Sequence, residues 1–211
     1  MTRQLNIETW NRKEHFQFFS QCDEPFFGIV SEIDCSEAYI YCKENQFPFF
    51  LYYHYKAITA ANRIEEFRYR IQDKKVIIFD TIHVTTTIAR GDNTFAFSFI
   101  PFTKTFYEFN ELAKTEIERV IDSVGIGITK DTGRPDVIHF STVPWISFTG
   151  VSHARNFKIK DSIPKITFGK YFHRNDRIIM PVSINVHHGL MDAFHVGKFL
   201  YLFEQMMNDK N

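Results

Sequence analysis

Residues 180–195 constrain the fold most strongly, because two kinds of periodicity meet there. From Ile178 to His187 apolar side chains alternate with other residues, which predicts a buried strand. From Ala193 to Met207 the apolar residues recur at helical spacing. Two adjacent histidines close the strand, and an aspartate follows four residues after the second. Strand and helix therefore meet at a polar corner that holds two imidazoles.

His188 is the candidate catalytic base at this corner. If the strand runs to its end, strand parity places His188 on the side of the apolar residues, and His187 on the other side. Burial disfavours the imidazolium, and a neutral ring is what a general base needs near pH 7. A hydrogen-bonded core histidine is the simpler alternative. A metal site formed with Asp192 and His195 is not expected, because adjacent histidines on a strand point apart and the spacing differs from helical zinc motifs.

The remaining pattern intermixes strands and helices. Strands are predicted at 25–33, 76–79, 81–89, 94–100, 137–142 running into 144–148, 165–172 and 178–187. Helices are predicted at 10–16, 34–44, 48–64 with helical character continuing to 71, 105–123 and 193–207. Because the turn at 91–93 makes a hairpin, a purely parallel sheet is excluded. The pattern favours an α+β fold, a two-layer α/β sandwich with a mixed β-sheet, in a single domain of residues 1–211.

Composition narrows the partners and the compartment. Lysine plus arginine balance aspartate plus glutamate at 25 each, which argues against nucleic acid or an anionic membrane as the main partner. The N-terminus lacks a signal-peptide core, and the densest apolar run, 47–55, is too short to span a bilayer. Cys22, Cys35 and Cys42 form no CxxC and leave one cysteine unpaired. A cytoplasmic location is expected.

The polar corner also resembles a known motif. His187-His-Gly-Leu-Met-Asp192 resembles the His-His-x-x-x-Asp-Gly motif of coenzyme A-dependent acyltransferases, and its surroundings are similar to chloramphenicol acetyltransferases in particular. The similarity covers nearly the whole chain. It includes Trp10-Asn-Arg-Lys-Glu-His-Phe16, Glu66-Phe-Arg68, Ile78-Phe-Asp80, Pro144-Trp-Ile-Ser-Phe148, Thr167-Phe-Gly-Lys-Tyr171 and Asp192-Ala-Phe-His-Val-Gly197.

The resemblance implies a reaction and an assembly. It implies a homotrimer with active sites at subunit interfaces, acetyl-CoA as a co-substrate, and neither a permanently bound cofactor nor a metal. The acceptor would be a hydroxyl of a hydrophobic small molecule, most simply chloramphenicol, and the acetylation would confer antibiotic resistance.

The resemblance also implies catalytic roles. His188 would deprotonate the acceptor hydroxyl, which attacks the thioester in a ternary complex. Asp192 would pair with Arg12 and hold the geometry of the site. Ser147 would donate a hydrogen bond to the tetrahedral oxyanion, and Thr167 would position a water there. Such a reaction needs a base and an oxyanion donor, so these roles agree with the chemistry.

Binding residues are implied in the same way. Lys170 and Tyr171, together with Ser147, would lie along the coenzyme, and a lysine near its phosphates is useful as a point charge. Phe19 and Phe27 would contribute to the acceptor pocket. The acceptor pocket is only partly matched, so the chemistry carries over better than the substrate does.

One departure motivates the alternatives. Ala193 replaces the glycine after the motif aspartate, and a positive φ there would strain the corner by about 1 kcal/mol or more. A catalytically impaired binding protein, or an acetyltransferase for a different hydroxyl acceptor, therefore remains open. The acyltransferase core of a 2-oxo-acid dehydrogenase complex is disfavoured, because these residues include no lipoyl region or flexible linker. A metal-dependent hydrolase is the last alternative.

Overall fold

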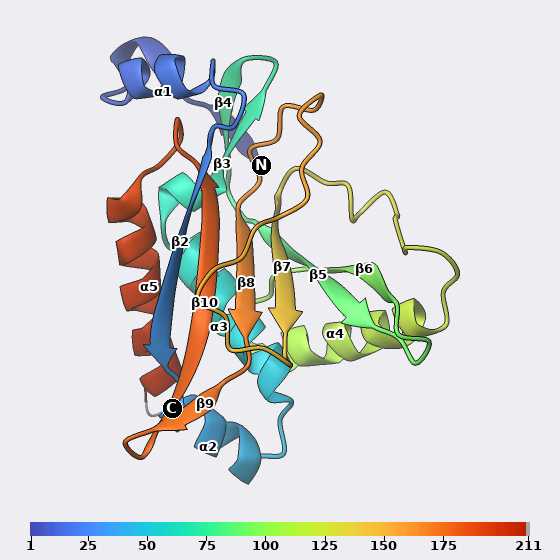
Figure 1. Ribbon diagram of the computed structural model, residues 1–211. Coiled ribbons are helices and arrows are strands. Elements are labelled where there is room, and N and C mark those ends of the chain that lie inside the picture. Colours follow the sequence, from blue (N-terminus) through green and yellow to red (C-terminus); the bar gives the residue numbers. More distant parts are fainter. Residues whose placement is uncertain (210–211) are drawn as a thin grey trace.

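A mixed β-sheet with helices packed on one face forms the body of the protein (Figure 1). The computed structural model describes residues 1–209, so the last two residues of the predicted domain lie outside it. The strand order is β2-β10-β8-β7-β5-β6, and β9 pairs with β10. The strands of this sheet are β2 (Phe26–Asp34), β5 (His83–Ala89), β6 (Phe95–Ile100), β7 (Val137–Val143), β8 (Lys165–Gly169), β9 (Phe172–Arg174) and β10 (Arg177–His187). The β5–β7 and β7–β8 pairs are parallel and the others antiparallel, so the predicted α+β fold with a mixed sheet is confirmed.

Helices α3 (Phe49–Asn62), α4 (Phe106–Ile121) and α5 (Ala193–Asn208) cover one face of this sheet, and α2 (Ser36–Glu44) packs on α3 and α5. Helix α1 (Lys13–Phe19) lies at one end of the molecule, above the sheet in Figure 1. Helices α3 and α5 pack on each other behind the sheet, and α4 packs on β6 (Figure 1). Buried phenylalanines such as Phe168, Phe199 and Phe203 fill the space between the layers. No helix of the described chain is long and apolar enough to cross a membrane.

The opposite face of the sheet carries polar side chains and is also covered. On β10 the residues of one parity, such as Val182 and Ile184, face the helices, yet Ser183 on the other parity is only 1 % exposed. The segment 144–164, which links β7 to β8, crosses this second face (Figure 1). A Cβ added at Gly169 would meet the ring of Phe148 from this segment at 3.0 Å. Strand β10 is therefore buried on both sides: its apolar side chains face the helices and its other side chains face the segment 144–164.

A second, three-stranded sheet was not predicted in full. It has the order β1-β4-β3, formed by β1 (Thr2–Gln4), β4 (Lys75–Phe79) and β3 (Tyr69–Gln72). The prediction of helical character to residue 71 was wrong, because the chain passes through a 3-10 turn (Glu65–Arg68) into β3. Pairing with β4 holds this backbone extended, and the buried guanidinium of Arg70 donates to main-chain carbonyls of Phe67, Tyr69, Pro135 and Val137.

Two strand ends also differ from prediction. The strand predicted to run into 144–148 ends at Val143, where Pro144 and Trp145 form a turn. The strand predicted at 165–172 is broken after Gly169, and its last residue starts the short strand β9. At that break the side chain of Pro181 lies 2.6 Å from a Cβ placed on Gly169, so only glycine fits there.

Candidate active site

Asp192 is held at the polar corner by the first turn of α5. Its side chain caps the helix by accepting from the backbone N–H of Phe194 at 3.0 Å, and it lies 2.9 Å from Nδ1 of His195. The other ring nitrogen of His195 is 3.5 Å from a carboxylate oxygen of Glu66. Aspartate at this position satisfies N–H groups that the helix cannot, which explains its place in the fold without any reference to catalysis.

Arg12 joins this cap to the histidine. Its Nη1 donates to Oδ2 of Asp192 at 2.5 Å, and its Nη2 donates to the backbone carbonyl of His188 at 3.0 Å. Partial burial pulls the pKa of Asp192 upward, but the hydrogen bond and charge of Arg12 outweigh it, so the pKa lies below its ordinary value. The contact predicted between Arg12 and Asp192 is present, and it fixes the main chain of the second histidine.

The ring of His188 lies between two aromatic side chains. It stacks on Phe19 with centroids 4.0 Å apart and an interplanar angle of 16°, and it contacts Phe27 at 4.5 Å. Its backbone N–H donates to the carbonyl of Pro25 at 2.8 Å. Nδ1 is buried, and among residues 1–209 it has no hydrogen-bond partner. Because β10 ends at His187, the parity argument does not extend to His188; the two aromatic rings orient it instead.

His187 has a different environment. Its side chain is buried, and its Nδ1 accepts the backbone N–H of Gly189 at 3.1 Å. Burial, assisted by the positive charge of Arg155, lowers the pKa of His187 to about 4. The ring is therefore neutral near pH 7, with one nitrogen already occupied by the turn.

A second group of polar side chains lies further along the sheet, on the face that the segment 144–164 crosses. Thr167 of β8 is in register with Ser183 of β10 and with Ser141 of β7, so the three side chains share this face. Thr167 is 1 % exposed, and its hydroxyl has no hydrogen-bond partner within the described chain. A buried hydroxyl without a partner is costly, so Thr167 is suited to hold a water or a substrate atom.

Ser141, which the sequence predictions missed, lines a cavity beside Thr167. Ser147, the predicted oxyanion donor, is exposed in the loop after the turn and does not line this cavity. The two serines are six residues apart in a stretch that reads as one continuous strand. Strand register distinguishes the two serines, since only Ser141 pairs with Thr167 of the neighbouring strand.

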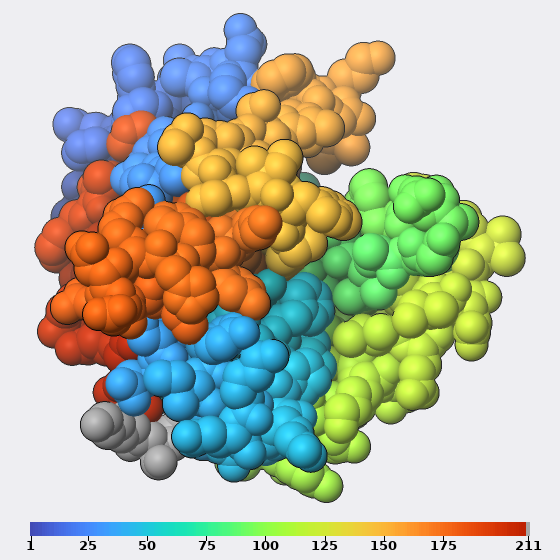
Figure 2. Space-filling model, turned by 60° about the horizontal axis from the view of Figure 1, so that its bottom comes forward, coloured from blue at the N-terminus to red at the C-terminus, as the bar shows by residue number. Residues whose placement is uncertain are grey.

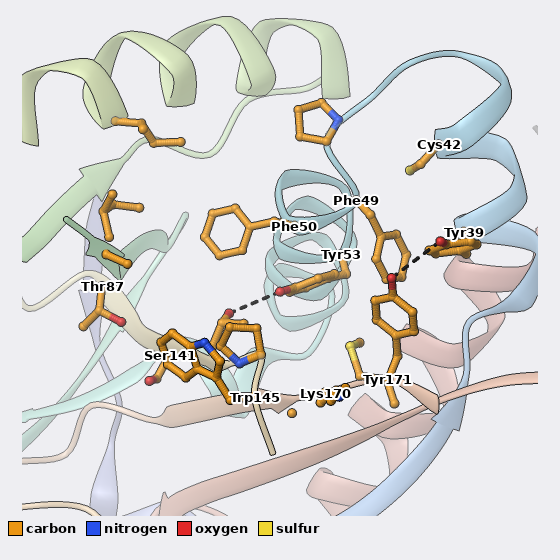
Figure 3. Close-up of a pocket in the computed structure, with 18 of the residues that line it drawn as sticks. Tyr39, Cys42, Phe49, Phe50, Tyr53, Thr87, Ser141, Trp145, Lys170 and Tyr171 are labelled. Carbon is orange, nitrogen blue, oxygen red and sulfur yellow. Dashed lines mark hydrogen bonds between the residues drawn. The ribbon is translucent and has the colours of Figure 1, made fainter. Parts of the chain in front are cut away.

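The cavity has a volume of about 1040 Å³, and eight of its 21 lining residues are aromatic. Figure 3 shows Ser141 and Trp145 at one end and Tyr39, Phe49 and Tyr171 at the other. Lys170 and Tyr171, both predicted to lie along the coenzyme, are among its lining residues.

The cavity lies where α2, α3 and the segments around β7 and β8 meet. Figure 2 shows the α2–α3 region (blue and cyan) beside the yellow and orange segments of the chain. The hydroxyl of Tyr171 donates to that of Tyr39 at 3.5 Å, and the Tyr53 hydroxyl lies 3.2 Å from Oγ1 of Thr142 (Figure 3). These contacts order the wall of the cavity, which suits an elongated ligand with both apolar and polar parts.

The two groups do not meet within one chain. Thr167 is aligned with Ser183, five residues before His188, which at ~3.3 Å per residue is a separation of ~16 Å along β10. Phe19 and Phe27 lie with His188, whereas Lys170 and Tyr171 lie with Ser141. Within residues 1–209 no group of three or more histidine, cysteine, aspartate or glutamate side chains is placed to hold a metal ion.

Comparisons with known proteins identify the class of this architecture. A solved structure of a dihydrolipoamide acetyltransferase from Azotobacter vinelandii superposes with a TM-score of 0.73 over 92% of this chain and 86% of that one. At 12% identity this similarity concerns the fold alone. A solved chloramphenicol acetyltransferase superposes with a TM-score of 0.91 at 30% identity, covering 99% of this chain and 100% of that one. The protein is an acyltransferase.

Sequence comparisons give the family. The chloramphenicol acetyltransferase family model matches residues 2–204. Chloramphenicol acetyltransferase 3 of Escherichia coli is 26% identical over 98% of this chain and 97% of its own length. The enzyme of Clostridium perfringens is 27% identical over 92% of this chain and 90% of its own. The chain belongs to the chloramphenicol acetyltransferase family.

Proposed function

We propose that the protein is an acetyl-CoA-dependent O-acetyltransferase in which His188 is the general base. The observation that carries this proposal is the clamp from Arg12 to both Asp192 and the His188 carbonyl, which holds an imidazole between two aromatic rings. A general base must lie within reach of the proton that it removes, whatever its pKa, and these contacts of Arg12 hold His188 in one place. The enzyme would act as one acyltransferase domain spanning residues 1–211.

The reaction then follows from proton and charge balance. His188 takes the proton of the acceptor hydroxyl as the oxygen attacks the thioester carbonyl of acetyl-CoA. The tetrahedral intermediate carries a negative oxygen, to which Ser141 donates a hydrogen bond while Thr167 holds a water. Collapse of the intermediate expels the coenzyme A thiolate, which recovers the proton from the imidazolium. Asp192 and Arg12 position the base and do not exchange protons with the substrate.

The separation of the two groups supports a homotrimer with active sites between subunits. A base ~16 Å from the hydroxyl pair along β10 cannot serve the same reacting atoms within one chain. A neighbouring copy that presents its His188 to the Ser141–Thr167 pair removes this difficulty. Exposed apolar side chains such as Trp145 and Ile146, 73% and 58% exposed, lie next to the cavity-lining serine and are suited to such a contact.

Acetyl-CoA would bind in the aromatic cavity. Its adenine and pantetheine parts match the aromatic wall with Tyr171, and Lys170 would face its phosphates as a point charge. The cavity leads to Ser141, so a thioester carried in it reaches the proposed oxyanion site. The predicted contact of Ser147 with the coenzyme would have to form outside the cavity of a single chain. The predicted cytoplasmic location agrees with a supply of acetyl-CoA.

Chloramphenicol is the acceptor named for the relatives and is the first compound to test. Release of the coenzyme A thiol from acetyl-CoA should accelerate when chloramphenicol is added, and antibiotic resistance would follow from such turnover. His188→Ala should lower this rate by about 10²-fold or more. No coenzyme binding would refute the whole proposal, whereas coenzyme binding without acceleration would refute only this acceptor.

The structure removes the reason for expecting an impaired enzyme, which was backbone strain at Ala193. Ala193 is the first residue of α5, and it is not one of the described residues with positive φ. Its side chain is exposed, so a methyl group costs nothing at this corner. The expected strain is absent, and the replacement of glycine gives no reason to expect reduced activity.

A further inference from the structure

The polar segment 153–165 has no role in the reaction described above, yet part of it is buried beside the reacting groups. Arg155 stacks its guanidinium 3.7 Å above the ring of Phe26, and the ammonium of Lys165 lies 4.6 Å from the same ring. Phe26 is in register with His187 at the end of β10. Lys165 and Arg155 are each only 12% exposed at the side chain. Two cations are thus packed on one aromatic ring next to the histidine pair.

This cluster lies on the sheet face that carries Thr167 and Ser141. Lys165 is two residues before Thr167 on β8, and His139 is two residues before Ser141 on β7, so all four side chains share one face at a spacing of ~7 Å. The aromatic cavity extends the other way along the same strands, through Gly169 to Lys170. If the coenzyme fills that cavity, the direction along β8 that remains for an acceptor whose hydroxyl reaches Thr167 is the one toward Lys165, beneath the segment 144–164.

The charges of the cluster do not cancel. Lys165 pairs with Asp161, and Arg155 pairs with Glu24, whose side chain is 44% exposed. The third cation, Arg70, is 1 % exposed and donates only to backbone carbonyls. Asp136 also lies near Arg70 but is paired with Arg134, so Arg70, Arg134, Arg155 and Lys165 are set against Asp136, Asp161 and the well-solvated Glu24.

The neighbouring histidines report the same positive environment. Burial first, and then the charge of Lys165, lower the pKa of His139 to about 4, and the same two causes lower the pKa of His153. Nε2 of His153 is buried and has no hydrogen-bond partner within residues 1–209. A neutral imidazole carries one N–H, so the unused Nε2 of His153 can donate to an anion without a change of charge.

We propose that the acceptor of this enzyme is an alcohol that bears an anionic oxygen group, a carboxylate or a phosphate, bound by Arg155, Lys165 and His153. The inference rests on the proposed acetyl transfer at the same site. Arg155 and Lys165 would hold the anionic group while the hydroxyl lies at the Ser141–Thr167 pair. An uncharged aromatic acceptor can be bound without this contact, so the inference is a preference for the anionic acceptor over the uncharged one.

Matched acceptors test this inference directly. The probes are 4-(hydroxymethyl)benzoate, its neutral analogue 4-(hydroxymethyl)benzamide, and 4-(hydroxymethyl)phenyl phosphate, each assayed by release of the coenzyme A thiol. We expect kcat/KM for at least one anionic probe to exceed that of the amide by tenfold or more. The carboxylate and phosphate arms identify which anion the site takes. Equal or higher turnover of the amide against both anions overturns the inference.

Variants that remove both partners of an ion pair test whether Arg155 and Lys165 cause the preference for anionic acceptors. In R155Q/E24Q the more exposed ion pair is removed without leaving either partner unpaired, and the anion preference should fall to within about threefold of one. The double variant K165M/D161N repeats the test at the buried Lys165–Asp161 pair. The single variant K165R keeps the positive charge, so it should retain the preference for the anionic probe. A preference that survives in both double variants would show that the anion binds elsewhere and overturn the assignment.

Binding measured without turnover separates this inference from the proposed function. Calorimetric titration of coenzyme A tests the coenzyme site, and titration of 4-(hydroxymethyl)benzoate tests the anion site with or without coenzyme A present. Coenzyme binding without binding of either anionic probe overturns the acceptor inference and leaves the proposed acetyl transfer intact. Anion binding that is lost in R155Q/E24Q supports the site even if acetyl transfer fails.

Discussion

Ser141 is the serine whose loss should disable acetyl transfer. It is half-buried on β7 and in register with Thr167. Ser141→Ala removes one hydroxyl at this position. The backbone of the strand is unchanged, because alanine adopts the extended conformation without strain. A change in activity can then be attributed to the missing donor.

The size of the effect follows from the charge that the donor meets. A hydrogen bond to the tetrahedral oxyanion forms only as the reaction proceeds, so its loss lowers kcat and leaves KM for acetyl-CoA nearly unchanged. Removal of one such donor typically costs about 10²–10³ in kcat, or roughly 2.7–4 kcal/mol. The melting temperature of Ser141→Ala should stay within about 2 °C of that of the wild type, since a small change in stability shifts it little.

Ser147→Ala is the matched control, assayed by the same thiol release and with the same acceptor. Because Ser147 is exposed and outside the cavity, its loss should change kcat by less than about threefold. A hundredfold loss in Ser147→Ala beside a normal rate in Ser141→Ala would refute the argument from register. It would show that the loop of 144–148 folds into the site when subunits associate.

Three further predictions test the corner and its surroundings. Arg12→Gln should lower kcat more than it raises KM. It should also lower the free energy of unfolding, measured in urea, by about 1.5–3 kcal/mol, because Asp192 loses a charge-assisted hydrogen bond. Arg12→Lys keeps the charge but not the two-pronged guanidinium, so it should recover only part of the loss. The free energy of unfolding should fall as the pH drops from 6.5 toward 4, since burial holds the pKa of His187 at about 4 while the unfolded chain binds a proton near 6.5. Between pH 7 and 5 His187→Gln should remove about 2 kcal/mol of that decrease, and an identical pH dependence in both proteins would contradict the assignment. Ala193→Gly should leave kcat unchanged and lower stability by up to about 1 kcal/mol, as expected for glycine in a helix; a sharp rise in turnover would revive the strained-corner hypothesis.

The long, strongly periodic elements were predictable from sequence, because their patterns arise from local packing. The final strand and helix were found nearly to the residue, with β10 ending at His187 and α5 beginning at Ala193. The short strands β1 and β3 were not, since three or four residues carry no periodicity and their conformation depends on pairing with β4. At β3 helical character was predicted, and pairing with β4 overruled it.

The site residues that depend on long-range contacts were likewise not predictable from local sequence patterns. The Arg12–Asp192 contact joins residues 180 positions apart, so no spacing rule predicts it, and only the family resemblance pointed to it. Ser147 was named from the family resemblance, and the predicted strand ran on through it because periodicity does not say where a strand stops. In the structure the turn at Pro144 removes Ser147 from the sheet and leaves Ser141 aligned with Thr167, so Ser141 is the oxyanion donor we propose.

The small sheet explains how His188, the proposed base, is held in place at the chain corner. Phe16 of α1, Ile78 of β4 and Leu190 of the corner itself are buried together in a second hydrophobic core, separate from the main one. Figure 1 shows α1 and the small sheet at the same end of the molecule as the end of β10. This core fixes α1 against the corner, and α1 in turn places Phe19 on the ring of His188 while the preceding Arg12 holds its carbonyl. A substitution that loosens this second core, far from any substrate, should therefore lower kcat before it unfolds the main sheet, because it releases the base and leaves the hydroxyl pair in place.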